Sequence, residues 1–173
     1  MTTMPLTRHL PRALRHLWLD AADARRLLRP EACARLEAAV QASEARHLGE
    51  LRLCVEAGLP WGALRQGLSA RQRALELFSA LRVWDTAHNN GVLIYLLLAD
   101  RRVEIVADRG IHACVGDTAW ETICGAMQQE FAAGRFEAGM LTGLAAVSDL
   151  LAQHFPAQAD SNPNELPDAP VIL

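Results

Sequence analysis

A chain of 173 residues, 51% of them hydrophobic, holds enough apolar material for one folded domain with short extensions, which excludes global disorder. Its formal net charge of −3 lacks the basic excess of nucleic-acid-binding proteins, so we expect no nucleic-acid partner. The most apolar stretch, residues 92–99, falls far short of the roughly 20 residues that cross a bilayer, and the N-terminus does not resemble a signal peptide. We therefore expect no membrane insertion.

The cysteines indicate the cellular compartment. Cys33, Cys54, Cys114 and Cys124 form no C-x-x-C pair, which argues against a zinc knuckle. Three of the four lie at apolar positions of predicted elements, where cysteine acts as a small hydrophobe. We expect free thiols, a reducing cytoplasmic location and a monomer whose protein partner is unknown.

Hydrophobic spacing in the first half of the chain predicts three helices and a strand. Apolar residues at three- and four-residue steps indicate helices over residues 6–28, 31–46 and 70–84. Alternating apolar and polar residues indicate a strand over residues 51–55. A loop rich in glycine and proline, residues 57–67, follows this strand.

The second half predicts a hairpin followed by two helices. After the turn signal at residues 89–91, the continuous apolar run 92–99 is typical of a central strand, and residues 103–107 form its hairpin partner. An irregular loop at residues 110–116 leads to a helix from residue 118, and a last helix ends near residue 155. The tail from residue 156 contains four prolines and is predicted to be disordered.

This order of elements predicts an α/β fold with a small mixed sheet of three strands, or four with a further short one, covered by helices. We divide the chain into an N-terminal helical extension (residues 1–29), an α/β domain (residues 30–155) and the tail (residues 156–173).

Topology suggests where chemistry could occur. If the first two strands are parallel and joined by a right-handed crossover, their starts and the end of the third strand share one rim of the sheet. The polar residues that gather at this rim include Glu44 and His47 beside the candidate ligands. Those candidates are Glu50, Asp85, Asn89, Asn90 and Asp108, with His88 and His112 as secondary ones.

Carboxylate and amide oxygens at one rim suit a hard cation, Ca²⁺ or Mg²⁺, whereas the histidines would favour a transition metal. Glu50, Asn90 and Asp108 are the strongest candidates, because each directly adjoins a strand end. The alternative is that these loops are polar only because they meet water.

Other chemistry-bearing residues favour structural roles. His9, His16 and His154 lie on predicted helices, where solvated or capping roles outweigh metal ligation. Trp18, Trp84 and Trp120 fall on helical stripes and are predicted to pack in the core. Cys114 lies two residues from His112, which leaves a nucleophile open, although an inert thiol is the stronger interpretation.

The run of residues 90–111 resembles the signature of the TPM domain family: an Asn-Gly turn, an apolar strand, an Asp-Arg turn, a Val-x-Ile strand and a Gly-containing loop. Leu48 to Leu51 resembles the entry to the family's first strand, and Phe131, Phe136, Gly139 and Gly143 resemble its C-terminal helix pattern. The family includes thylakoid-lumen proteins, a receptor modulator and many bacterial proteins, and the resemblance covers roughly residues 30–155.

The resemblance implies an α/β/α sandwich, binding of calcium or another divalent cation near the loops, and the acid phosphatase activity claimed for plant members. Where the family commonly has Asp-Asn-Gly, this chain has Asn89-Asn90-Gly91 and is one carboxylate poorer. Asp85 or Asp108 would have to compensate for it.

Three functions follow from these observations. The first is a binding or scaffolding module that uses a divalent ion. The second is a metal-assisted phosphatase, which normally needs several fixed carboxylates, so the missing one favours binding. The third is a partner-binding role for the helix at residues 6–28.

Overall fold

The computed structural model describes residues 11–158 and 164–173, in which it places eight helices and four strands. Three helices precede the first strand and three follow the hairpin. In chain order the elements are α1 (Arg12–Trp18), α2 (Ala21–Leu27), α3 (Pro30–Glu44), β1 (Leu51–Glu56), α4 (Trp61–Arg65), α5 (Ala70–Ala80), β2 (Val92–Leu97), β3 (Arg102–Ala107), α6 (Arg109–Val115), α7 (Asp117–Ala132), α8 (Phe136–His154) and β4 (Val171–Ile172).

The four strands form one mixed sheet in the order β3-β2-β1-β4. β1 and β2 are parallel, with Leu51 opposite Val92, and the chain between them runs through α4 and α5. β2 and β3 form the predicted antiparallel hairpin. The predicted parallel pair, the hairpin and the small mixed sheet are therefore confirmed.

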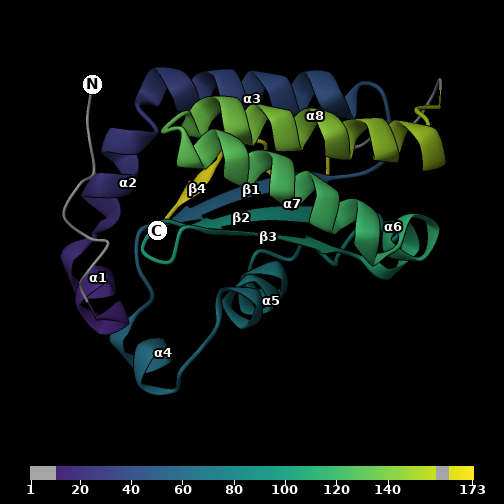
Figure 1. Cartoon of the computed structure of the whole chain (residues 1–173). Helices are drawn as coiled ribbons and strands as arrows, with labels where there is room; N and C mark the ends of the chain where they lie inside the picture. The colour runs from purple at the N-terminus through teal and green to yellow at the C-terminus, as the bar shows by residue number, and fades with distance from the viewer. Residues whose placement is uncertain (1–10, 159–163) are drawn as a thin grey trace.

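The sheet lies between two helical layers (Figure 1). α3, α7 and α8 cover one face, and α5 covers the other. Alternate residues of each strand point to opposite faces: Leu51, Leu53 and Val55 enter the larger core, while Cys54 enters the smaller one. All six residues of β2 are buried, as expected for a strand covered on both faces. The chain thus forms the predicted α/β sandwich.

The N-terminal segment differs from the single predicted helix. α1 and α2 are separate, because the side chain of Asp20 caps α2 by accepting hydrogen bonds from the backbone N–H groups of Ala22 and Asp23. Ala24 and Leu28 lie in the larger core, so α2 packs with the segment that we divided from it at residues 29 and 30. The part of the predicted helix before residue 11 lies outside the described residues.

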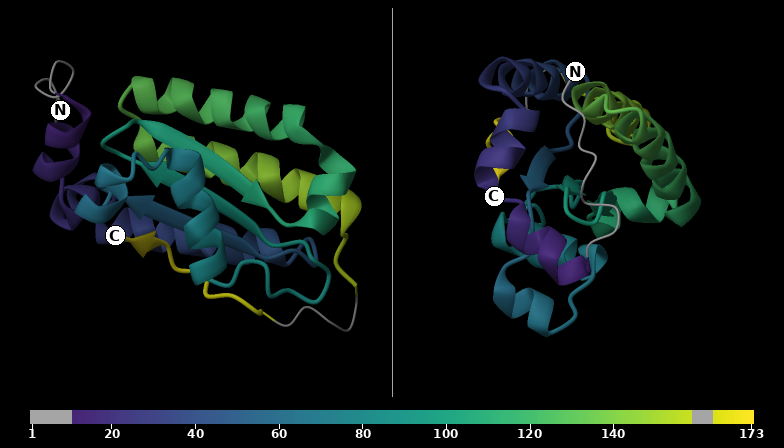
Figure 2. Two further views of the ribbon diagram at one scale, coloured as in Figure 1. Left: turned by 90° about the horizontal axis from the view of Figure 1, so that it is seen from below. Right: turned by 60° about the vertical axis from the view of Figure 1, so that its left-hand side comes forward.

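The prediction of a disordered tail is wrong for residues 164–173. This segment runs beside the start of β1 and ends as β4, which pairs in parallel with Cys54 and Val55 (Figure 2). Leu166 is buried in the smaller core. Local composition suggested disorder, but the open edge of β1 supplies hydrogen-bond partners that composition does not reveal.

Two tryptophans predicted to lie in the core are exposed. Trp84 is 50% exposed because α5 ends at Ala80 and Arg82 adopts a left-handed φ of 56°, which interrupts the helical spacing. Trp18 is 73% exposed, since it ends the short helix α1. Trp120 is buried, as predicted.

Short helices also occupy two predicted loops, as α4 and α6. Within the described residues, no helix is long and apolar enough to cross a membrane.

Candidate functional site

The rim predicted from topology exists at the backbone level. Leu51 and Val92 are register partners at the starts of β1 and β2, and Val92 also lies opposite Ala107 at the end of β3. Two backbone bonds extend this row: the N–H of Val92 donates to the Glu50 carbonyl at 2.9 Å, and that of Asp108 donates to the Gly91 carbonyl at 2.8 Å. The structure therefore brings three distant stretches of the chain to one end of the sheet.

Close backbone packing explains the glycines of this rim. A Cβ on Gly91 would overlap the Val83 carbonyl oxygen, and one on Gly110 would lie 2.5 Å from the Asn89 carbonyl oxygen. Instead, the N–H of Gly110 donates to that oxygen at 2.9 Å. The glycines of the Asn-Gly and Asp-Arg-Gly sequences thus allow the start of α6 to pack closely against the turn before β2.

Asn90 and Asp108 each present a buried oxygen without a partner among the described residues. Asn90 is fully buried and its Nδ2 donates to the Leu48 carbonyl at 3.0 Å, yet its Oδ1 accepts no hydrogen bond. Asp108 caps α6 through Oδ1, which accepts from the backbone N–H of Arg109 at 2.7 Å, while its Oδ2 accepts none. Since buried oxygens normally have partners, these two require an explanation.

Glu50 points elsewhere. Its Oε2 accepts a hydrogen bond from the backbone N–H of Leu166 at 3.0 Å, so its carboxyl group holds the C-terminal segment. Burial raises the pKa of Glu50, although backbone N–H groups of that segment act in the opposite direction. The backbone of Glu50 lies at the rim, but its carboxylate is already bound.

The remaining predicted ligands lie near the rim without converging. Asp85 and His88 are exposed. Asn89 uses its Oδ1 to accept from the guanidinium of Arg109, at 3.0 and 3.2 Å. His112 lies 3.7 Å from Asp117 on α7. Across the described residues, no group of three or more His, Cys, Asp or Glu side chains could hold a metal ion.

A cation at this rim would therefore depend on the Asn90 and Asp108 oxygens. The donor set is all oxygen, which suits Ca²⁺ or Mg²⁺, and Mg²⁺ commonly uses one or two protein ligands and keeps several waters. Asn90 Oδ1 and Asp108 Oδ2 are oxygens of the type that these ions prefer and accept no hydrogen bond among the described residues, whereas the Glu50 carboxylate already accepts one from Leu166.

Three carboxyl groups gather beside the rim, and one of them was missed from the sequence. Glu44, Glu50 and Asp168 are buried, and Glu44 also accepts from the backbone N–H of Leu51 at 3.1 Å. Burial, followed by the neighbouring carboxylates of Glu50 and Asp168, raises the pKa of Glu44 to about 8. Asp168 was missed because it lies in the tail; the apolar pair Val171-Ile172 three residues later was the only signal of a strand.

His47, three residues after Glu44 in the chain, is buried and neutral. Its Nδ1 donates to the Gly49 carbonyl at 3.0 Å, and its Nε2 lies 2.8 Å from the Ser43 hydroxyl, which donates to it. Burial lowers the pKa of His47 to about 4. The ring therefore fixes the chain before β1 and offers no free nitrogen to a ligand.

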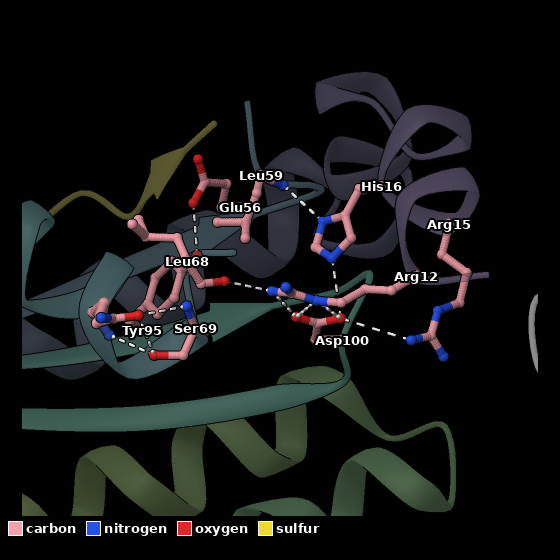
Figure 3. A network of polar contacts seen from close by, with 10 residues as sticks. Arg12, Arg15, His16, Glu56, Leu59, Leu68, Ser69, Tyr95 and Asp100 are labelled. Atoms are coloured by element: carbon pink, nitrogen blue, oxygen red, sulfur yellow. Dashed lines mark hydrogen bonds and ion pairs between the residues drawn. The ribbon is translucent and has the colours of Figure 1, made fainter. Parts of the chain in front are cut away.

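A polar network at the opposite end of the sheet attaches α1 (Figure 3). The backbone N–H of Leu59 donates to Nδ1 of His16 at 2.9 Å, which leaves its Nε2–H to donate to Asp100 at 3.0 Å. Arg12 adds a salt bridge to the same carboxylate at 2.9 Å. His16 is thus buried rather than solvated, and it holds α1 to the hairpin turn.

Among the described residues, the thiol considered as a nucleophile has a hydrogen bond to a backbone carbonyl and none to a side-chain base. The Sγ of Cys114 lies 3.4 Å from the Gly110 carbonyl, to which it donates, and His112 faces Asp117 instead. Cys33, Cys54, Cys114 and Cys124 are all free thiols, as predicted. This arrangement supports the inert interpretation of Cys114.

Comparison with known proteins agrees with the fold. The TPM domain family matches residues 21–150. The NMR structure of the BA42 protein from the psychrophilic bacterium Bizionia argentinensis is 30% identical, with a TM-score of 0.72, over 82% of this chain and 92% of that one.

A second solved structure supports the fold alone. The solution NMR structure of the N-terminal domain of a protein from P. gingivalis is 20% identical, with a TM-score of 0.60, over 76% of this chain and 83% of that one. A search of curated proteins finds no match. The family match spans most of the chain, including β1, α5, the hairpin and α7, and the chain therefore belongs to the TPM domain family.

Proposed function

We propose that this chain is a non-catalytic binding module whose rim holds a divalent cation, Ca²⁺ or Mg²⁺, between α6 and the turn before β2. The observation that carries the proposal is the pair of buried, unpartnered oxygens, Asn90 Oδ1 and Asp108 Oδ2. The N–H of Asp108 donates to the carbonyl of Gly91, the neighbour of Asn90, so the two residues hold nearby backbone positions at the end of the hairpin.

A hard cation would remove the free-energy cost of burying these two oxygens without a hydrogen-bond donor. An unsatisfied buried acceptor costs about 1–3 kcal/mol, and oxygen ligands are those that both ions prefer. With two protein ligands the ion would keep several waters, which leaves coordination positions for a partner. Binding would then depend on the cation without any bond being made or broken.

Titration with CaCl₂ or MgCl₂, followed by amide NMR shifts, tests this function. We expect saturable shifts in residues 49–51, 89–91 and 108–111, and at least tenfold weaker binding in Asp108→Asn. Asp149→Asn, an exposed carboxylate on α8, is the matched control and should bind the ion as the unchanged chain does. Shifts confined to exposed carboxylates, or lost equally in both variants, would refute the rim site.

The same variants separate binding from catalysis. A phosphatase would turn over p-nitrophenyl phosphate only with added cation and would lose that turnover in Asp108→Asn. A binding module shows cation-dependent shifts and no turnover.

A further inference from the structure

The outer edge of β3 is a surface that the rim does not use. β3 ends the sheet order, and α5 and α7 lie on either side of it (Figure 1). The N–H of Asp108 donates to the carbonyl of Gly91, the residue before β2, and hydrogen-bonding directions alternate along a strand. Val103, Ile105 and Ala107 therefore direct their backbone N–H and C=O groups away from β2.

Val103 and Ile105 are only 3% and 4% exposed, so side chains of this chain lie close against the edge. The Ile105 carbonyl accepts from Nη1 of Arg71 at 2.5 Å, and the Ile105 N–H lies against the sulfur of Cys124. The Arg71 side chain is 50% exposed, so a competing donor could displace it. Arg71 thus occupies one hydrogen-bonding position of a strand that could add to this edge.

The edge opens into a groove of about 400 Å³. Apolar side chains of Val103, Ile105, Ala107 and Trp120 line it. Trp120 is 6% exposed, and its indole N–H has no acceptor among the described residues. Because buried indole N–H groups normally find a partner, this donor suits an additional carbonyl group.

Charge around the groove selects the occupant. Glu104, Asp117 and Glu121 contribute three carboxylates, against one guanidinium from Arg71 and one imidazole from His112. Pairing of β3 with β3 of a second copy would set the α7 carboxylates of the two copies face to face. These carboxylates would attract the side chains of a basic segment, whereas they would repel the same carboxylates of a second copy.

We propose that β3 binds an extended, basic peptide segment of a partner protein by adding it as a further strand. The backbone of the segment would pair with Val103, Ile105 and Ala107 and displace Arg71, while its Lys or Arg side chains would face Asp117 and Glu121. This inference rests on the proposed binding role but not on the cation.

The test uses the full chain in EDTA and a defined probe, the acetylated and amidated peptide Lys-Val-Lys-Val-Lys-Val. We expect slowed amide exchange at Val103 and Ala107. Affinity should rise several-fold in Arg71→Ala, because the competing guanidinium is gone. It should fall several-fold in Asp117→Asn with Glu121→Gln. These three residues are exposed, so their substitution should leave the fold intact.

Two further peptides define failure. An N-methylated version that cannot pair its backbone, and the Glu-Val counterpart, should both bind at least tenfold more weakly. The proposal is overturned if either binds equally well, if Arg71→Ala weakens binding, or if β3 becomes protected only as the chain dimerises. If the peptide does not bind in EDTA, but CaCl₂ or MgCl₂ shifts the rim amides in the separate titration, the peptide proposal fails and the cation proposal does not.

Discussion

At the scale of single residues, the ionisable groups buried beside β1 differ from ordinary surface charges. Glu44 remains protonated near neutral pH, with a pKa of about 8, and His47 remains neutral, with a pKa of about 4. Both lie within a few residues of the rim. Their titration should therefore appear in the stability of the region that positions Glu50 and the start of β1.

Stability should decrease as pH rises from 6.5 to 8. The folded-state pKa of Glu44 lies above its ordinary value of 4.5, so its contribution is complete below pH 4.5 and is lost as pH rises to about 8. His47 acts with the opposite sign, but only below its ordinary pKa of 6.5. One proton corresponds to about 1.4 kcal/mol per pH unit at most.

Urea unfolding of Glu44→Gln, measured between pH 6.5 and 8, should show a flatter pH dependence than the unchanged chain. Glu121→Gln, on the exposed face of α7, is the control and should keep the original slope. Equal slopes in all three proteins would mean that Glu44 is ionised in the folded state.

The sequence predicted which residues lie at the rim. It predicted less well which partners their side chains bind. Asn90 and Asp108 adjoin strand ends, and both keep an oxygen without a partner. Glu50 adjoins a strand end as well, but its carboxylate binds the C-terminal segment. Strand position fixes where a backbone lies, whereas the side chain follows whichever donor packs nearby, and that donor lies 116 positions along the chain.

At the scale of elements, hydrophobic periodicity predicted the helices and strands whose buried residues recur at regular spacing in the sequence. The hairpin and the helices at α3, α7 and α8 were predicted from periodicity close to their observed bounds. The tail was not, because β4 has only two residues and its order depends on partners in β1. Arg52 also binds this segment, through the carbonyl groups of Pro167 and Ala169.

Two leucines of the C-terminal segment provide a matched test of its docking. Leu166 is 6% exposed and Leu173 is 39% exposed. Leu166→Ala should cost about 2–3 kcal/mol of unfolding free energy, because it leaves a cavity in the smaller core. Leu173→Ala should cost less than about 1 kcal/mol. Thermal unfolding of both variants measures the difference, and equally small losses would indicate that the segment does not pack on β1.

At the scale of the whole molecule, the sheet serves two surfaces at different places. At its rim Asn90 precedes β2 and Asp108 follows β3, and the outer edge of β3 carries the groove beside Trp120. The topology that creates both was predictable from the order of elements, since a right-handed crossover and a hairpin fix the strand directions. The groove was not, because it depends on which helix faces lie beside β3.

The most direct test is the position of a bound ion. Mn²⁺ accepts the same oxygen ligands and is visible by anomalous scattering in crystals soaked with MnCl₂. The account predicts a peak about 2.0–2.6 Å from both Asn90 Oδ1 and Asp108 Oδ2. A peak found only at other carboxylates, such as Glu44 with Asp168, with the rim oxygens bound to protein donors or water, would contradict it.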